Sequence, residues 1–240
     1  MAGPGHLGQP KDLKEARALQ EALRQRVRLR PLRRRAVRLV AAVDCAFLKD
    51  WVVAAACLWS LQGLELLREA FALQKAPFPY VPGYLAFREA PAMLRALGGL
   101  GTTPHVVLID GQGIAHPRGL GLASHVGVLL GLPTVGCAKS LLVGSSREPG
   151  PKRGSFSVIE YNSRVVGAAL RTKDSTRCVY VSPGHLLNLR DALWVVLKSS
   201  SGSYRLPEPL RWADARSRQL KKRLANEGRD LHGADLQALL

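Results

Sequence analysis

The sequence has no apolar run long enough to cross a membrane, because its longest apolar stretches, such as residues 52–58, are only as long as a strand. Its four cysteines form no CxxC pair, and the histidines are not spaced for a zinc site. Its first residues lack the basic and then apolar pattern of a secretory signal. These absences exclude a membrane-spanning helix and argue against zinc. They predict reduced cysteines in a cytoplasmic protein.

Acidic residues are also scarce, since the chain has 18 of them against 35 lysines and arginines, with a formal net charge of +17. A surplus of this size attracts polyanions such as nucleic acids, and the attraction depends strongly on salt. Some proteins are basic without any polyanionic partner, so the charge alone does not decide the function. In a chain with so few acids, those beside strand ends and turns need a specific explanation.

Length and composition predict a single globular domain. The 240 residues suit one medium-sized domain, and 47% apolar residues are enough for a hydrophobic core. We expect a loose leader over residues 1–10, one domain over 11–224 and a C-terminal tail over 225–240. No internal repeat is visible in the sequence, and we expect a monomer.

Hydrophobic periodicity predicts an α/β fold. A helix is expected over residues 11–29, followed by a meander of three strands whose first two are joined at Lys49 and Asp50. The alternation of strands and helices after the meander predicts a mixed sheet flanked by helices. The expected strands are 37–47, 52–60, 64–74, 105–109, 133–138, 156–160, 164–171 and 178–182. The further helices expected are 89–97, 121–131, one after SPGH (182–185) and one after Pro207 and Pro209.

A glycine-rich loop follows the expected strand 105–109. A dinucleotide-binding loop has the pattern G-x-G-x-x-G, but here His116 occupies the position of the third glycine, and no Walker lysine follows. A nucleotide cofactor is therefore disfavoured. Asp110, at the end of that strand, lies where open α/β sheets place their sites.

Four acids have positions typical of a metal site. Asp44 interrupts an apolar strand and Asp110 ends another, while Glu89 and Asp214 are expected near the starts of helices. A salt bridge to an arginine is the alternative for Asp44, and favourable placement near a helix N-terminus is the alternative for Glu89 and Asp214. Together the four carboxylates predict a site for Mg²⁺, with Mn²⁺ as the expected substitute. Such ions activate water and stabilise charge in phosphodiester hydrolysis.

Three further residues are candidates for contact with a nucleic acid. Lys139 follows a buried strand and could neutralise a scissile phosphate, although most lysines are simply solvated. His116 could contact phosphate or cap its own loop. Tyr80 lies in the rigid loop FPYVPG and could wedge between bases, with packing in the core as the alternative.

Long motifs in this order resemble the endonuclease V family of inosine-directed repair nucleases: AAVDCAF, FPYVPGYLAFRE, LIDGQGIAHPRGLGLASHVG, GCAKSLLVG, SPGH and LPEPLRWAD. The resemblance extends from about residue 11 to residue 224. It implies a ribonuclease H-like fold and Mg²⁺-dependent DNA repair. In such repair, inosine-containing single- or double-stranded DNA is nicked at the second phosphodiester bond 3′ to deoxyinosine, leaving 3′-hydroxyl and 5′-phosphate ends.

The resemblance also implies roles for individual residues. Asp44, Glu89 and Asp110 would hold the metal, and Asp214 is at a position where the family has Asp or His. Lys139 matches a catalytic lysine, and His116 a residue near the cleaved backbone. Tyr80 matches the wedge that replaces the everted base. Backbone groups of Gly83, Leu85, Gly111, Gly121 and Leu142 would form the hypoxanthine pocket, and Pro82 would also bind the substrate.

Some alternatives stay open at this point. The residues after SPGH, Asn188 to Arg190, depart from the serine-rich version common in the family, which leaves a role for His185 undecided. The motifs do not separate inosine in DNA from inosine in RNA. A structure-specific nuclease of the same fold, and a basic nucleic-acid-binding module with structural acids, are the other two hypotheses.

Overall fold

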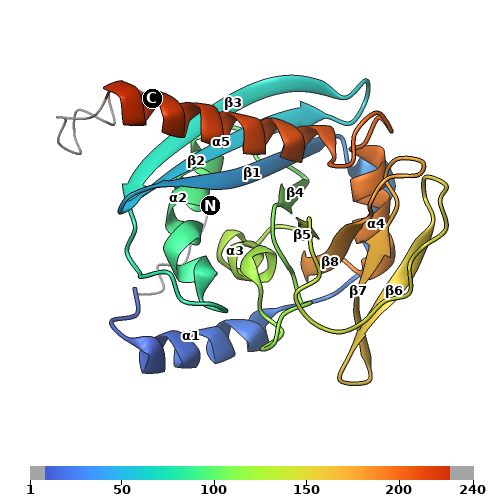
Figure 1. Cartoon of the computed structure of the whole chain (residues 1–240), viewed down its shortest axis with the longest axis horizontal. Coiled ribbons are helices and arrows are strands. Elements are labelled where there is room, and N and C mark those ends of the chain that lie inside the picture. Colours follow the sequence, from blue (N-terminus) through green and yellow to red (C-terminus); the bar gives the residue numbers. More distant parts are fainter. Residues whose placement is uncertain (1–8, 228–240) are drawn as a thin grey trace.

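The computed structural model describes residues 9–227, which form one eight-stranded mixed sheet with helices on both faces (Figure 1). The strand order is β3-β2-β1-β4-β5-β8-β7-β6. The strands are β1 (Leu39–Leu48), β2 (Trp51–Ser60), β3 (Glu65–Lys75), β4 (Val106–Ile109), β5 (Thr134–Ala138), β6 (Phe156–Tyr161), β7 (Arg164–Leu170) and β8 (Val179–His185). The helices are α1 (Leu13–Arg26), a 3-10 turn η1 (Arg34–Ala36), α2 (Leu85–Gly99), α3 (Leu122–Leu130), α4 (Leu189–Lys198) and α5 (Glu208–Glu227).

The predicted α/β class and the mixed, helix-flanked sheet are confirmed. β1, β2 and β3 form the expected antiparallel meander, with its first turn at Lys49 and Asp50. β1, β4 and β5 are parallel neighbours, and α3 makes the crossover between β4 and β5. Parallel strands end at the same edge, so the carboxyl ends of β4 and β5 lie side by side.

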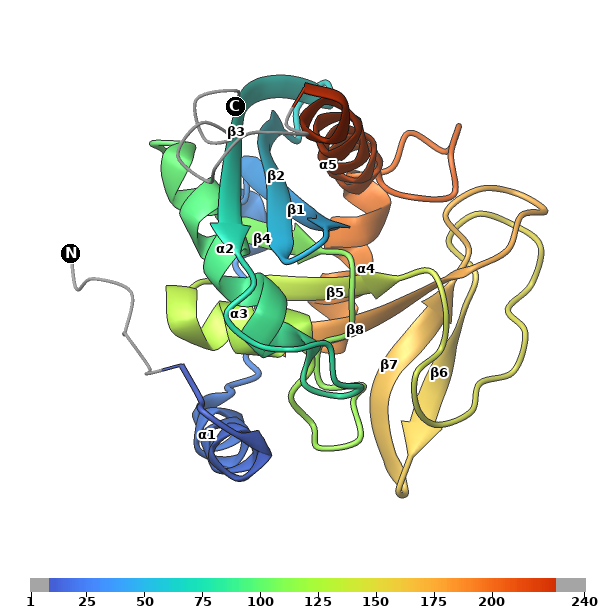
Figure 2. The same ribbon diagram turned by 60° about the vertical axis from the view of Figure 1, so that its left-hand side comes forward.

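The sheet separates two hydrophobic layers, because alternate side chains of a strand point to opposite faces. Val40 and Ala42 of β1 pack with α4 and α5 on one face. Ala41 and Val43 pack with α2 and α3 on the other. Figure 2 shows these two pairs of helices on either side of the sheet, with α1 lying outside α3. No helix in the described part of the chain is long and apolar enough to span a bilayer.

Several predicted boundaries are wrong, and prolines and caps explain part of the difference. α1 ends at Arg26, where Val27 turns to extended backbone. SPGH is the end of β8, and Asn188 caps the helix that follows it. α5 begins at Glu208, so Pro209 lies in its first turn, where the missing N–H costs nothing. α5 also includes residues 225–227 of the predicted tail. Residues 1–8 and 228–240, the rest of the predicted leader and tail, lie outside the described residues.

Candidate active site

Three of the four candidate metal ligands meet at one end of the sheet. Asp44, Asp110 and Asp214 each offer a carboxylate oxygen, and these oxygens all lie within 4.8 Å of one another. We call these residues the carboxylate cluster. They border a hollow of about 390 Å³ that Arg218 and Lys221 also line. This hollow could admit a metal ion and part of a polyanion.

The layering of the sheet explains why these residues meet. Asp44 has the same parity along β1 as Ala42, whose face of the sheet packs against α5. Asp214 lies in the second turn of α5, above that face. Asp110 follows β4, the parallel neighbour of β1. The helix-start explanation for Asp214 is therefore wrong, since the residue lies beyond the first turn.

Glu89 approaches the cluster from the opposite face. It belongs to α2, which starts at Leu85 rather than at Glu89 as predicted, so the residue lies after the first turn. It is 7% exposed and lies outside the group of oxygens within 4.8 Å. Its charge interacts with Asp44 and Asp110 all the same. Direct metal contact by Glu89 stays a prediction.

Two basic side chains neutralise part of the cluster. Lys139 Nζ donates to Asp110 Oδ2 at 2.5 Å and to Asp214 Oδ1 at 2.8 Å, and Arg218 donates to the same Asp214 oxygen at 2.8 Å. Burial alone would lower the pKa of Lys139, but the hydrogen bonds to both aspartates outweigh it and raise the pKa. Lys139 is therefore a charged partner of the cluster rather than the simply solvated lysine of the alternative.

At Asp44 and Glu89, burial outweighs the compensation that the charges of Lys139 and Arg88 provide. Burial, and then the negative charge of Asp110, raise the pKa of Asp44 to about 7. Burial, and then Asp44 and Asp110, raise the pKa of Glu89 to about 8. The salt-bridge alternative for Asp44 finds no support, because no salt bridge involves it in the described part of the chain. Crowded carboxylates of this kind favour a bound cation.

These two shifts predict that the metal-free protein becomes less stable as pH rises. Both folded-state pKa values exceed the ordinary ones, so the stabilisation is complete at low pH and is lost as pH rises through 7 to 8. We expect the free energy of unfolding in EDTA to fall by at least about 1.4 kcal/mol between pH 6.5 and 9, the value of one pKa unit.

Denaturant unfolding across this pH range, with EDTA or with Mg²⁺, provides the measurement. Mg²⁺ should remove most of the loss because it replaces the protons. Burial lowers the folded-state pKa of His116, His125 and His185 from 6.5 to about 4, so these side chains add stability as pH rises through 6.5, and above about pH 7.5 only the loss from the two carboxyl groups remains. The same slope in wild type and in Asp44→Asn would contradict the prediction.

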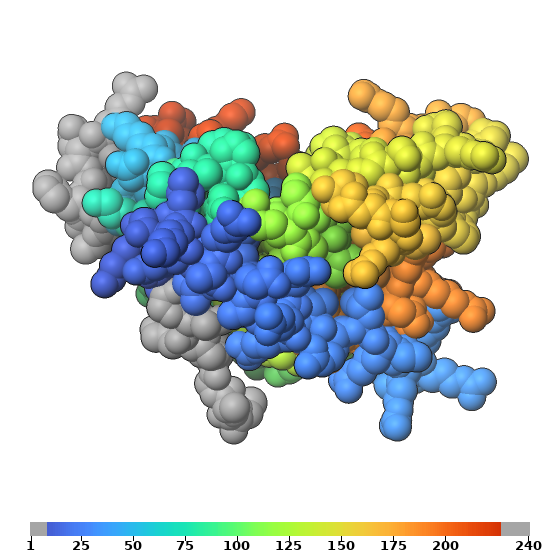
Figure 3. Space-filling model, turned by 90° about the horizontal axis from the view of Figure 1, so that it is seen from below, coloured from blue at the N-terminus to red at the C-terminus, as the bar shows by residue number. Residues whose placement is uncertain are grey.

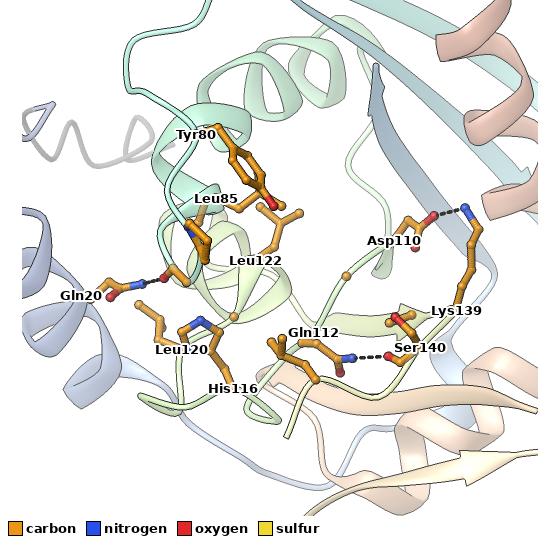
Figure 4. A pocket seen from close by; sticks show the side chains of 17 residues that line it. Gln20, Tyr80, Leu85, Asp110, Gln112, His116, Leu120, Leu122, Lys139 and Ser140 are labelled. Atoms are coloured by element: carbon orange, nitrogen blue, oxygen red, sulfur yellow. Dashed lines mark hydrogen bonds and ion pairs between the residues drawn. The ribbon is translucent and has the colours of Figure 1, made fainter. Parts of the chain in front are cut away.

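A second hollow adjoins the carboxylate cluster, and we call it the main pocket (Figure 4). Its volume is about 440 Å³, and it shares Asp110 and Lys139 with the hollow beside the cluster. The structure brings to its wall all the residues predicted to bind the substrate: Tyr80, Pro82, Gly83, Leu85, Gly111, Gly121 and Leu142. Residues that the sequence did not single out also line it: Gln20, Ala86, Gln112, Leu120, Leu122, Ala138 and Ser140.

Three residues that line the main pocket at the start of α2 have unpaired backbone donors. The N–H groups of Gly83, Leu85 and Ala86 have no hydrogen-bond acceptor in the described part of the chain. Tyr84 precedes α2 without a side-chain cap. Free N–H groups at a helix start favour a ligand with acceptor atoms.

Glycine at position 121 is fixed by packing. A Cβ on Gly121 would lie 2.3 Å from the carbonyl oxygen of Gln112, so no other residue fits without moving the loop. A Cβ on Gly111 would lie 3.3 Å from Leu122 and would narrow the main pocket.

His116 caps its own loop, as one alternative expected. Its Nδ1 accepts from the N–H of Arg118 at 3.2 Å, and it also interacts with the Gly83 backbone. Burial, and then the charge of Arg118, lower its pKa to about 4, so the ring is neutral at pH 7. A neutral ring offers no positive charge to a phosphate.

Tyr80 is 67% exposed at the rim of the main pocket, so the core-packing alternative is wrong for it (Figure 4). His185 is remote from the site. It pairs with Thr134 at the start of β5, whereas Lys139 follows the end of that strand. Its Nδ1 accepts a hydrogen bond from the Arg28 N–H at 3.2 Å. This bond holds the segment after α1 against the end of β8.

The family model described as Endonuclease V matches residues 21–215. The chain belongs to the endonuclease V family. The endonuclease V of Geotalea uraniireducens is 45% identical over 213 residues, which are 89% of this chain and 90% of that protein. The crystal structure of endonuclease V from Streptomyces avermitilis is 42% identical with a TM-score of 0.85, covering 91% of this chain and 96% of that one. The protein is therefore a nuclease, with the architecture that the resemblance implied.

A more distant member of the family was crystallised with nucleic acid. Endonuclease V of Ciona intestinalis is 26% identical with a TM-score of 0.78, covering 90% of this chain and 100% of that one. Its crystal contains a 24mer DNA with an inosine followed by a ribo-adenosine.

Proposed function

We propose that this chain is a Mg²⁺-dependent repair endonuclease that nicks DNA at the second phosphodiester bond 3′ to deoxyinosine. The products would carry 3′-hydroxyl and 5′-phosphate ends. The observation that carries the proposal is the adjacency of two hollows, one suited to a single base and one beside the carboxylate cluster, which share Asp110 and Lys139. The inosine in the DNA bound by the Ciona relative supports the choice of lesion.

The donor set fits the proposed ion. Asp44, Asp110 and Asp214 supply hard oxygen ligands close together, which suit Mg²⁺ and also Mn²⁺. When bound, the ion would supply activation of the attacking water and stabilisation of negative charge on the scissile phosphate. Glu89 would lie behind this set, and a bound cation would favour its charged form, because burial and the neighbouring aspartates otherwise raise its pKa to about 8.

The residues of the main pocket would select and hold the everted base. The free N–H groups of Gly83, Leu85 and Ala86 can donate to the acceptor atoms of hypoxanthine. Gly111 and Leu122 would set the width of the pocket on one side and so exclude a base with an additional exocyclic amino group. Lys139 would neutralise the phosphate beside the cluster, and His116 would hold the wall between base and backbone.

The decisive experiment uses end-labelled oligonucleotides that carry one inosine, made as DNA and as RNA, with and without Mg²⁺. We expect a single nick in DNA, one nucleotide beyond the inosine, only when Mg²⁺ is present. Efficient cutting of the RNA alone would instead support an inosine-specific endoribonuclease. Equal cutting of inosine-free branched DNA would identify a structure-specific nuclease. Binding unaffected by Mg²⁺, with no product, would identify a binding module.

Replacing Tyr80 by alanine should weaken binding of inosine-containing duplex about 10- to 100-fold, because stacking of an aromatic ring on a base is worth roughly 1–3 kcal/mol. The single-turnover rate at saturating enzyme should change much less, since Tyr80 does not border the hollow beside the cluster. Phe156→Ala, which removes another exposed ring, is the matched control. A Tyr80 variant that binds as tightly as this control would contradict the wedge role.

A further inference from the structure

Gln20 is a polar side chain on the apolar face of α1, and it is only 1% exposed. Its neighbours on that face, Ala16 and Leu23, are also buried. α1 forms part of the molecular surface beside the segments that surround the main pocket (Figure 3), and Gln20 reaches the wall of that pocket (Figure 4). A buried amide costs free energy unless it is hydrogen-bonded, so this position requires specific partners.

Both ends of the Gln20 amide have such a partner. Nε2 donates to the carbonyl oxygen of Gly83 at 2.8 Å, and Oε1 accepts from Nε of Arg118 at 2.5 Å. Arg118 donates to the same Gly83 carbonyl through Nη2, and its guanidinium lies 4.2 Å from the centre of the Tyr84 ring. α1, the glycine-rich loop and the proline-rich loop are thus joined at a single carbonyl group.

This carbonyl lies at the entrance to α2. Gly83 has a φ of +80°, a conformation that favours glycine, and α2 begins two residues later. Holding the carbonyl fixes the ψ angle of Gly83 and so the direction of the chain into Leu85 and Ala86. The unpaired N–H groups belong to this short stretch, whose residues line the main pocket.

We propose that Gln20 is a positioning residue for base recognition, which holds the backbone donors of Gly83, Leu85 and Ala86 through its hydrogen bond to the Gly83 carbonyl. This inference rests on the proposed function and assigns it a further specificity-determining residue. Glutamine suits the task because one side chain supplies a donor for the carbonyl and an acceptor for Arg118. Glutamate supplies only the acceptor, and methionine supplies neither.

The test compares Gln20→Glu and Gln20→Met with Gln25→Glu and Gln25→Met. Gln25 lies on the same helix, is exposed and does not line the main pocket, so it is a matched control. Each protein is titrated without Mg²⁺ with two duplexes that differ only in inosine or adenine at one position. Nicking is then measured with Mg²⁺ at saturating enzyme.

We expect both Gln20 variants to bind the inosine duplex about tenfold more weakly and the adenine duplex unchanged, so selectivity falls about tenfold. The nicking rate at saturation should stay within about twofold of wild type, because the carboxylate cluster is untouched. Amide hydrogen exchange over residues 83–86 should become faster in both variants. The Gln25 variants should match wild type in all three measurements.

Wild-type selectivity in Gln20→Glu would overturn the proposal, since that variant lacks the donor to Gly83. An equal loss of affinity for both duplexes would also overturn it, because that result indicates general destabilisation. If Gln20→Met does not fold, Gln20→Glu carries the test alone. Failure of the proposed function would look different from failure of the positioning role, because wild type and the Gln25 variants would then show no preference for the inosine duplex. In that event, unchanged hydrogen exchange over residues 83–86 would still refute the positioning role.

Discussion

Replacing Asp110 by alanine is expected to lower the nicking rate by at least about 1000-fold while affinity for inosine-containing DNA is retained. Asp110 supplies one of the three oxygens of the carboxylate cluster and also borders the main pocket. Losing metal stabilisation worth about 4 kcal/mol slows a reaction by about three powers of ten. Binding should persist, because removing a negative charge does not weaken the attraction of a basic protein for a polyanion.

Single-turnover nicking with excess enzyme and Mg²⁺ measures the first effect, and titration of the labelled duplex without Mg²⁺ measures the second. Asp50→Ala is the control, since Asp50 is an exposed acid in the turn between β1 and β2. That variant should nick at the wild-type rate. Normal nicking by the Asp110 variant would exclude the cluster as the metal site.

Replacing Lys139 by methionine is expected to slow nicking about 100- to 1000-fold, the usual cost of removing one group that stabilises charge in a transition state. Its ammonium lies between Asp110 and Asp214, where the main pocket meets the hollow of the cluster. The proposed position of the scissile phosphate is the same place.

The Mg²⁺ concentration needed for half-maximal nicking distinguishes the Lys139 variant from the Asp110 variant. The three cluster carboxylates remain in Lys139→Met, so the Mg²⁺ concentration for half-maximal rate should stay within about tenfold of wild type. Lys198→Met, an exposed lysine at the end of α4, is the control. A Lys139 variant within threefold of this control at saturating Mg²⁺ would refute a role for the ammonium in the chemistry.

Local sequence patterns were enough to place most helices and strands and to indicate the edge of the sheet that carries the candidate site. Period-two and helical patterns are local, so they gave the meander, the β4-α3-β5 unit and the turn at Lys49 within a few residues. The position of Asp110 after an apolar strand implied a site at that edge of the sheet. The long motifs also named individual binding residues, and the structure places these residues around the main pocket. Their role in binding the substrate stays a prediction.

Which side chains meet at that edge depends on how distant segments pack. Asp44 joins Asp214 because its face of β1 packs against α5, whereas Glu89 comes from α2 on the other face. His185 is equally conspicuous in the sequence but lies at the opposite end of β5. Strand parity is readable from the chain, but the helix that covers each face depends on crossovers between distant segments.

Gln20 shows the same limit most clearly. In the sequence, Gln20 interrupts an apolar helical stripe. This position indicates that its side chain is buried, but it does not indicate which groups its amide bonds to. Its partners, Gly83 and Arg118, are 63 and 98 residues away along the chain. Local patterns therefore encode what is buried. Hydrogen bonds between loops that far apart exist only once the sheet has brought α1, α2 and the glycine-rich loop together.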